Sequence, residues 1–466
     1  MYLLRVSQSP LRVSLREGSH SDLRSFHLNY LSSSAIRLLS TTIEGVAMTG
    51  IRLFAGALLL FLVPGMVVAG GFQLNEHGAT AMAQGGAFAA RASDLSAMYF
   101  NPAGLAQLSG LHVALGGTMI LPRTSFESVL TNSIDMVKQT FFIPNVYASY
   151  ALENGLVFGA GFCTPFGLGT EWPENWAGRN RAVKADLKSY AVNPTVAYKI
   201  NDILFAGVGF SYMWSNVKLS YFPDLGALQG FAPNGKVALD AKGNSWSING
   251  GVIFKPLPEL SIGMSYRHST EVSFEGTATF TSMGQLAPYF PGGSGTTSIK
   301  FPNQIFAGVS YKLSQNTTLE FDYQWIGWSS YDTLVIGLPT GPVFPLAGRP
   351  LQATSKSPKD WNDASMLRLG MEYVHNEWAF RMGFIYDATP QPNRTVEPLL
   401  PDANRFEGTL GIGYKVVENW SIDVAYQLIL FETRTVTGPL GGDLNTFPGK
   451  YQSTANLFGL GVSYAM

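Results

Sequence analysis

The chain has 466 residues, a formal net charge of −1, 46% hydrophobic residues and only 14% charged residues. This balance argues against a nucleic-acid partner, because such a partner requires a basic face that displaces counterions. The mean hydropathy is +0.10, and only one stretch approaches the roughly 20 apolar residues of a membrane helix, which excludes a polytopic helical membrane protein.

That stretch is LFAGALLLFLVPGMVVA, residues 53–69, and a single arginine precedes it. One cation, an apolar core and small residues before a cut are typical of a secretory signal peptide. We therefore predict residues 48–69 as a signal peptide that is cleaved after Ala69, with a single membrane anchor as the alternative. Residues 1–47 do not fit such a signal, and we interpret them as a non-native upstream extension or a long n-region.

Residues 70–108 form an irregular segment that is rich in Gly and Ala and contains short helix-forming pieces such as ATAMAQGG (79–86). The segment has no apolar alternation. Irregular backbone cannot face lipid, because each unpaired N–H or C=O group would cost several kcal/mol there. In a membrane protein this segment must therefore lie inside a barrel or below it.

From about residue 111 onward, apolar residues alternate with small or polar ones before each turn. This period of two is that of a strand with two different faces. An even count of strands is usual for a single-chain outer-membrane barrel. The alternating runs predict about fourteen strands, which begin near residues 111, 144, 155, 189, 203, 245, 258, 299, 316, 365, 377, 408, 420 and 455.

The segment ELSIGMSYRHSTEVSFEGTATF (259–280) shows the pattern well. Tyr266 and Val272 share the apolar parity, and Glu271 and Glu275 share the polar one. Because the phase holds across the middle, we predict one long strand whose glutamates face the lumen.

The face that carries the charges decides between a soluble β-sandwich and a membrane barrel. Here the apolar runs are long, many carry Tyr or Trp near their ends, and the polar faces consist mostly of Gly, Ser and Ala. We predict an all-β protein: a transmembrane antiparallel β-barrel of about 14 strands at residues 109–466, with residues 70–108 inside the barrel or below it. Met466 stands where such barrels commonly end in an aromatic residue that their assembly machinery reads.

Five segments of the chain stand out: GGFQLNEHG (70–78), NPAGL (101–105), TPFGLGTEW (164–172), PQPNRTVEPLLPDANRF (390–406) and LFGLGVSYAM (457–466). Together they resemble the FadL/TodX-like (OMPP1) family of long-chain fatty acid and aromatic hydrocarbon transporters of the outer membrane.

The resemblance implies that residues 70–108 form a hatch that plugs the lumen of the barrel and that the mature N-terminus lies beside the ligand. It places Phe72 and Leu74 at the ligand. The hatch motif consists of Asn101, Pro102 and Ala103. The family's third strand has a kink that opens a lateral hole toward the bilayer, and the resemblance places this kink at Pro165 and Gly167.

Two long loops, residues 171–187 and 221–243, are expected to form an external groove that captures the solute. Its candidate contacts are apolar side chains that could equally pack on one another. They are Trp172, Trp176, Phe222, Leu225, Leu228 and Phe231.

The charge of the ligand stays open at this point. A fatty acid carboxylate in an apolar lumen needs a cation or several donors. At the two positions where fatty acid carriers of the family place basic residues, this chain has Tyr221 and Val335, and Lys218 is the nearest cation. By the resemblance, we predict these three residues as ligand-binding residues of the lumen, with Phe72 and Leu74. Inward-facing arginines are Arg267, Arg368 and Arg381, for which ion pairs that hold the barrel shape are the expected role.

We therefore expect an outer-membrane channel of a Gram-negative bacterium that takes up long-chain fatty acids or other hydrophobic compounds and releases them laterally through the kink. The alternative is a channel specific for neutral aromatic or aliphatic hydrocarbons. A lipid-modifying enzyme is a more distant alternative, because no histidine lies in a nucleophile motif and no cluster has metal spacing. Expected partners are the hydrophobic solute, the bilayer with lipopolysaccharide, and the assembly machinery; we expect a monomer without cofactor or metal.

Overall fold

The computed structural model describes residues 70–128, 131–232, 234–351, 354–437 and 447–466. The predicted extension and signal peptide, with the cleavage after Ala69, lie outside the described residues. In the part of the chain that the structure describes, no helix is long and apolar enough to cross a membrane.

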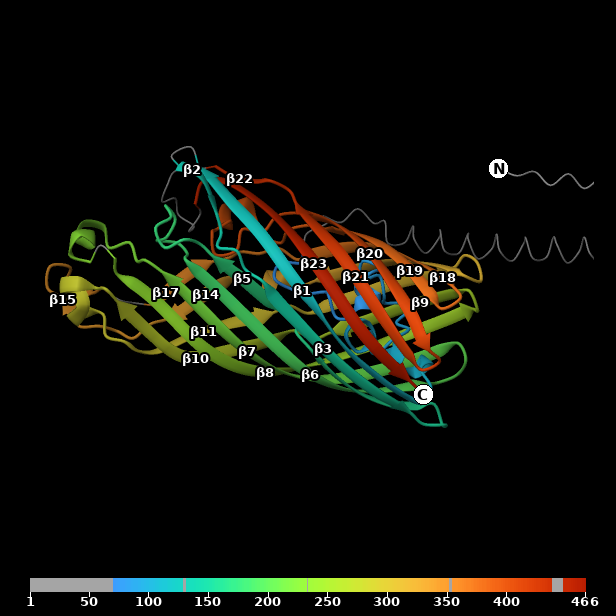
Figure 1. Ribbon diagram of the computed structural model, residues 1–466. Helices are drawn as coiled ribbons and strands as arrows, with labels where there is room; N and C mark the ends of the chain where they lie inside the picture. The colour runs from blue at the N-terminus through green and yellow to red at the C-terminus, as the bar shows by residue number, and fades with distance from the viewer. Residues whose placement is uncertain (1–69, 129–130, 233, 352–353, 438–446) are drawn as a thin grey trace, which may run out of the picture. The chain divides into compact units, whose positions relative to one another are not determined.

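Twenty-one strands join into one sheet whose first and last long strands also pair with each other (Figure 1). All pairings between neighbours are antiparallel. The wall consists of β1 (Leu111–Ser128), β3 (Phe141–Ala151), β4 (Leu156–Cys163), β5 (Gly167–Glu171), β6 (Lys184–Lys199), β7 (Leu204–Tyr221), β8 (Lys236–Leu257), β9 (Leu260–Arg267), β10 (Thr270–Thr281), β11 (Gly293–Phe301), β12 (Gln304–Lys312), β13 (Thr317–Ile326), β14 (Thr333–Gly337), β17 (Ser355–Pro358), β18 (Ala364–His375), β19 (Trp378–Asp387), β20 (Arg405–Val417), β21 (Trp420–Phe431), β22 (Arg434–Val436) and β23 (Gly449–Ala465), and β2 (Thr131–Asp135) extends the edge of β1.

These segments form a closed antiparallel barrel of 14 strands, so the predicted fold is confirmed. Several of the strands consist of two segments in line, which are β4 with β5, β9 with β10, β12 with β11, β13 with β14, β18 with β17, and β21 with β22. The seam runs from the pair His112–Ala465 to the pair Glu127–Lys450. Closure in this way leaves no free edge along β1 or β23.

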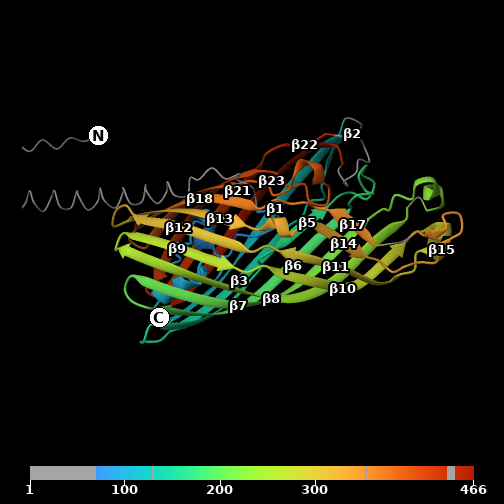
Figure 2. The ribbon, with the colours of Figure 1, turned by 180° about the vertical axis from the view of Figure 1, so that it is seen from behind.

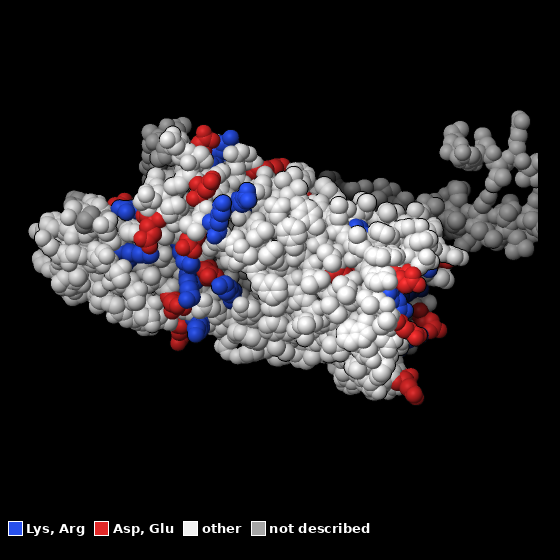
Figure 3. All heavy atoms as spheres, viewed as in Figure 1, with Lys and Arg blue, Asp and Glu red and all other residues white. Residues whose placement is uncertain are grey.

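The outer surface of the barrel is apolar, as the alternation predicts. Leu115, Phe142, Trp246 and Leu410 are among the large hydrophobic side chains that are more than half exposed on the strands. Figure 3 shows a broad uncharged zone on one face, with acidic and basic side chains gathered toward its two ends. A soluble barrel would carry its charges on this surface, so the arrangement is that of a barrel in lipid.

The segment 259–280 differs from its prediction. It forms two strands, β9 and β10, and their faces are exchanged: Tyr266 is 39% exposed, whereas Val272 is fully buried and Glu275 is exposed. The reason lies in the register against β8, where Arg267 pairs with Asn249 and Glu275 with Lys242. The segment advances by one residue more than its neighbour, and one extra residue moves every following side chain to the other face.

Residues 70–108 lie inside the barrel, where Figures 1 and 2 show them in blue behind the strands. They contain α2 (Ala79–Met82), α3 (Ala97–Phe100) and the 3-10 helix η1 (Pro102–Gln107), which packs against β6, β7 and β8. We call residues 70–108 the hatch. The loops carry the remaining short elements, which are η2 (Gly226–Phe231), η3 (Gly284–Tyr289), η4 (Trp328–Ser330), β15 (Val343–Phe344), β16 (Arg349–Pro350) and η5 (Asn393–Thr395).

Candidate functional site

Buried carboxylates of the wall hold the middle of the hatch. Asp322 on β13 accepts hydrogen bonds from the backbone N–H groups of Phe88 (2.7 Å) and Ala89 (2.8 Å), and Glu320 accepts one from Ala90 (2.7 Å). Both carboxylates are almost completely buried. The irregular backbone therefore finds on the wall the acceptors that a helix or sheet would otherwise supply.

Asn101 ties the hatch to β8. Its side chain is fully buried, its Nδ2 donates to the carbonyl of Val252 (3.1 Å), and its Oδ1 accepts from the N–H of Ala103 (3.2 Å), which caps η1. A side chain at Gly251 could not fit, because its Cβ would lie 2.2 Å from Oδ1 of Asn101. The small residues of the lumenal faces thus let the hatch approach the wall closely.

A chain of ion pairs joins the hatch to the wall near the end of the barrel that holds the C-terminus. Arg381 contacts Glu372 (2.6 Å) and Asp423 (2.6 Å), and Glu372 also pairs with Arg91 of the hatch (2.9 Å). A cavity of about 460 Å³ lies here between the hatch and the wall. The predicted role of Arg381 in lumenal ion pairs agrees with this geometry.

The first residues of the hatch rest on a buried acid and its arginine. The backbone N–H of Gly70 donates to Oδ1 of Asp387 (2.6 Å), and Nε of Arg405 donates to Oδ2 of the same carboxylate (2.7 Å). Arg405 also donates to the carbonyl of Gly71 (3.2 Å). Asp387 is completely buried.

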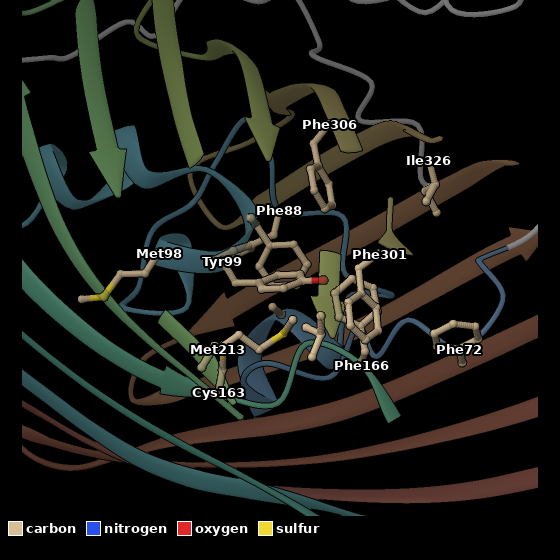
Figure 4. Close-up of a cluster of buried hydrophobic side chains, with 14 of the residues drawn as sticks. Phe72, Phe88, Met98, Tyr99, Cys163, Phe166, Met213, Phe301, Phe306 and Ile326 are labelled. Atoms are coloured by element: carbon tan, nitrogen blue, oxygen red, sulfur yellow. The ribbon is translucent and has the colours of Figure 1, made fainter. Parts of the chain in front are cut away.

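Phe72 sits in an aromatic cluster and is 5% exposed. Figure 4 shows Phe166 and Phe301 between Tyr99 on one side and Phe72 on the other. The Phe166 and Phe301 rings stack with their centroids 4.3 Å apart. The rings around Phe72 have centroids between 4.6 and 6.4 Å from its own and belong to Trp328, Tyr331, Trp361, Phe301 and Phe166.

The hatch pairs directly with the break in the third strand. The N–H of Gly167 donates to the carbonyl of Phe72 (3.1 Å), and the N–H of Leu74 donates to the carbonyl of Pro165 (3.0 Å). Proline has no N–H for the ladder of the sheet, and here its carbonyl turns to the hatch. The break therefore leaves a short strand edge, and Gln73 of the hatch forms an antiparallel β-bridge with Phe166 there.

The third strand is also bulged at this break. Cys163 pairs with Ala191 of β6, and Gly167 pairs with Lys188, so the strand carries one residue more than β6 between the two pairs. On its other side, pairing with β3 ends at Phe162. Among the described residues, no pairing joins the beginning of β3 to β5, which leaves a gap in the wall.

A cavity of about 380 Å³ occupies this gap, and we call it the lateral cavity. Its lining includes Phe142, which is 67% exposed on the outer face, and Glu407, which is 4% exposed in the lumen, so the cavity crosses the wall. Residues 71–76 of the hatch form one side. The Phe141 ring covers Gly169 so closely that a Cβ there would lie 1.9 Å from it.

Phe72 also lines a small cavity of about 30 Å³, which we call the chamber. Most of its lining is aliphatic or aromatic. The lining residues are Phe72, Leu168, Ala185, Asp186, Leu187, Val217, Leu219, Thr297, Ile299, Tyr331, Leu334, Lys359, Trp361, Glu397, Leu399 and Leu400.

Burial changes the protonation of two neighbouring hatch residues in opposite senses. Desolvation lowers the pKa of His77 to about 3, against a weaker opposing effect of its hydrogen bond with the carbonyl of Leu74 (2.8 Å). Desolvation raises the pKa of Glu76. Each shift favours the uncharged form, as burial in a medium of low dielectric does.

The comparisons with known proteins agree with this geometry. Residues 60–466 match the model of the family described as outer membrane protein transport protein (OMPP1/FadL/TodX). The chain belongs to this family. Its members are outer-membrane transport channels and not enzymes, so the predicted location and the non-enzymatic assignment are confirmed.

Proteins that are similar in sequence align over most of this chain and nearly all of their own length. The long-chain fatty acid transport protein of Escherichia coli K12 is 22% identical over 455 residues, covering 88% of this chain and 97% of that protein. Outer membrane protein P1 of Haemophilus influenzae is 23% identical over 466 residues, covering 88% and 98%.

Solved structures of the family share the fold. The FadL homologue of Pseudomonas aeruginosa has a TM-score of 0.75 at 19% identity, covering 85% of this chain and all of that one. The toluene transporter TodX of Pseudomonas putida has a TM-score of 0.67 at 16% identity, covering 84% and 98%.

Not every residue that the family resemblance suggested lies in the lumen. Lys218 is on the outer face of β7, where its side chain is 49% exposed and lies 2.9 Å from Asp240. It shares the parity of Tyr212 and Trp214, which are exposed. The prediction of a lumenal Lys218 is therefore corrected.

Val335 and Tyr221 also lie away from the lateral cavity. Val335 stands opposite Lys356 on β17, on the face of β14 opposite to that of Leu334, which lines the chamber. Tyr221 is half-buried against a cluster of loop residues around η2 and η3. Phe72, Leu74 and Gly167 line the lateral cavity, and Pro165 forms the break beside it.

The external groove residues divide into packed and exposed side chains. Trp172 and Trp176 stack with centroids 4.5 Å apart and are at most 2% exposed, so they are loop core and not an open surface. Phe222 is buried beneath Arg179, whose guanidinium carbon lies 4.6 Å from the ring centroid. Phe231 is 47% exposed. The two remaining groove candidates, Leu225 and Leu228, are partly buried in the cluster around η2 and η3.

Sequence reasoning missed the charged groups that surround Phe72. Asp387 and Arg405 anchor the first hatch residues, and Lys359 and Glu397 form a buried pair beside the chamber. Residues 390–406 were singled out for their resemblance to the family, and that segment contains Arg405 and Glu397. No residue-level pattern connected Arg405 with Asp387, 18 positions earlier, or Glu397 with Lys359, 38 positions earlier.

Proposed function

We propose that this chain takes up small hydrophobic compounds, of the size of a fatty acid or an aromatic hydrocarbon, across the outer membrane. Curated relatives are named as long-chain fatty acid transport proteins, and similar structures are titled as toluene transporters. The observation that carries the proposal is the lateral cavity, because it joins the surroundings of Phe72 to the lipid-facing side of the wall.

The physical reason for such a path is the partition of apolar solutes. An apolar compound gains about 25 cal/mol for each Å² of surface that leaves water. Phe72, Leu74, Phe141 and Leu168 offer such a surface inside the wall. In this proposal the solute enters among the loops near Phe231, binds beside Phe72 and leaves through the gap between β3 and β5 into the bilayer.

The proposal includes maturation of the chain. Cleavage after Ala69 would turn the Gly70 amide that Asp387 holds into an α-ammonium group. An ion pair would then replace the hydrogen bond of 2.6 Å, and buried charge pairs of this kind are stronger than neutral hydrogen bonds. The new cation would also offset the carboxyl groups of Glu407 and Asp402, which lie near Arg405. We propose a monomer, since the lateral cavity must face lipid.

The experiment that tests lateral release removes the bulge while it leaves both strands in place. Deletion of Thr164 makes the third strand equal in length to its partner between Cys163 and Gly167. The gap then closes. We expect uptake of a radiolabelled hydrophobic solute by cells that express the protein to fall at least tenfold, which corresponds to a barrier about 1.4 kcal/mol higher once the lateral path is lost.

Thr164→Ala is the matched control, because it keeps the bulge and changes one side chain. Heat-modifiable electrophoretic mobility shows that each variant has a folded barrel. Normal uptake by the folded deletion variant would contradict lateral release, whereas lack of uptake by the unmodified protein would contradict the proposed function itself.

A further inference from the structure

A buried ion pair borders the chamber beside Phe72. The Nζ of Lys359 donates to a carboxylate oxygen of Glu397 and to Oγ of Ser357 (3.0 Å). The side chains of Lys359 and Glu397 are only 2% and 11% exposed. Neither charge is therefore screened well by water.

The two residues come from separate parts of the chain that the fold brings together. Lys359 follows β17 in the break of its strand, where its N–H donates to the carbonyl of Asp332 (2.6 Å). Glu397 lies in the loop between β19 and β20, and Glu397 and Leu400 form an isolated bridge. Trp172 donates from Nε1 to the carbonyl of Pro398 (3.0 Å), which ties this loop to the loop that follows β5.

The chamber contains few charges besides this pair. Of its lining residues, Asp186 is the third that is charged, and its carboxylate lies 3.3 Å from the ammonium group of Lys188 on the same strand. Aromatic and aliphatic side chains such as Trp361 and Leu334 make up most of the remainder. An ammonium group in such a place must have a counter-ion, because an unpaired buried charge is very costly.

We propose that Glu397 determines the specificity of the channel by occupying Lys359 in the position that the carboxylate of a solute would take. The inference rests on the proposed function and deepens it. With Glu397 in place, the wall of the chamber presents no free cation. A neutral hydrophobic group that enters as the side chains around this space of about 30 Å³ move apart then meets no unpaired charge. A solute with a carboxylate would have to displace Glu397 and leave that side chain buried without its cation.

The direct test compares two probes that differ in charge and share an alkyl chain: palmitate and methyl palmitate. Binding of each radiolabelled probe to the purified full-length protein in detergent is measured against empty micelles at pH 8. We expect the unmodified protein to bind the methyl ester more tightly than palmitate.

Glu397→Gln frees Lys359 and keeps the shape of the side chain. We expect it to tighten the binding of palmitate about tenfold or more, the scale of one charge-assisted hydrogen bond, and to leave the ester within about twofold. The double variant Lys359→Met with Glu397→Gln is the matched control. It again presents no net charge, so it must lose the gain for palmitate and keep the preference for the ester.

Two results would overturn the inference. One is that Glu397→Gln, with a normal heat-modifiable mobility that shows a folded barrel, has the same ratio of palmitate to methyl palmitate affinity as the unmodified protein. The other is tight binding of palmitate by the unmodified protein that Lys359→Met abolishes. If Glu397→Gln does not fold, the double variant still decides, because loss of the ester preference there contradicts a neutral chamber. Binding of neither probe to the unmodified protein would instead contradict the proposed function.

Discussion

The middle and the beginning of the hatch meet the wall in different ways. In the middle, Asp322 and Glu320 collect several backbone N–H groups, and Asn101 bridges to β8. At the beginning, residues 71–76 line the lateral cavity, and Gly71, Phe72 and Leu74 form hydrogen bonds with Arg405, Gly167 and Pro165. The difference teaches that buried carboxylates of the wall anchor the middle of the hatch, whereas the beginning borders the lateral cavity and is tied to the break in the third strand.

The largest effect is expected where the anchor in the middle of the hatch is broken. Asp322→Ala leaves the buried N–H groups of Phe88 and Ala89 without an acceptor, at a cost of about 1–3 kcal/mol for each group. We expect the free energy of hatch opening to fall by roughly 2–6 kcal/mol, measured as faster amide hydrogen exchange of residues 88–91. Thr318→Ala, farther along the same strand, serves as the control, and unchanged exchange in Asp322→Ala would contradict the anchoring role.

A smaller effect is expected where the beginning of the hatch is released. Asp387→Ala removes the acceptor of Gly70 and the partner of Arg405, and we expect exchange of residues 70–74 to accelerate by the equivalent of about 1–3 kcal/mol. Exchange at residues 88–91 should stay as it is. Equal acceleration in both parts of the hatch would show that they move as one unit.

The smallest effect concerns pH and the boundary between the two parts. Burial lowers the pKa of His77 to about 3, so the folded hatch binds fewer protons than the unfolded one between that value and the ordinary 6.5. Neutral His77 therefore makes its full contribution to the stability of the folded hatch above pH 6.5. As the pH falls below 6.5, this contribution decreases by at most about 1.4 kcal/mol per pH unit.

Amide exchange of residues 75–80, compared at pH 7 and pH 5 after correction for the intrinsic rates, measures this loss. His77→Gln should remove the pH dependence, because the amide does not titrate and can still donate to the carbonyl of Leu74. Because burial raises the pKa of Glu76, its contribution has the opposite sign, and Glu76→Gln isolates it. A pH dependence that survives in both variants would assign the effect to other groups.

The barrel was predictable because its strands obey one local rule. Runs such as residues 203–214 alternate between lipid and lumen with a period of two, and lipid makes the outer face uniformly apolar. The rule failed at His268 and Ser269, where one extra residue exchanged the faces of β9 and β10. A bulge leaves the alternation intact on either side of it, so local reading cannot detect the exchange.

The site was predictable in part. Phe72, Leu74 and Pro165 were placed by resemblance, and the structure brings them together at the break of the third strand. Lys218 was misplaced, because a cation near a strand end can face either side of the wall. The pair of Lys359 and Glu397 depends on a contact between a strand break and a loop 38 positions later, which the alternating pattern does not show.

The seam between β1 and β23 has a consequence for the order in which the molecule forms. The carbonyl and the N–H of Met466 both bond to Leu111 at distances of 2.9 Å, so the last residue of the chain completes the first strand of the wall. Contacts so remote in sequence carry the largest loop-closure entropy and form slowly. The hatch precedes β1 in the chain, and its bonds to Asp322 and Asn249 need only β13 and β8, so these bonds do not depend on the closed seam.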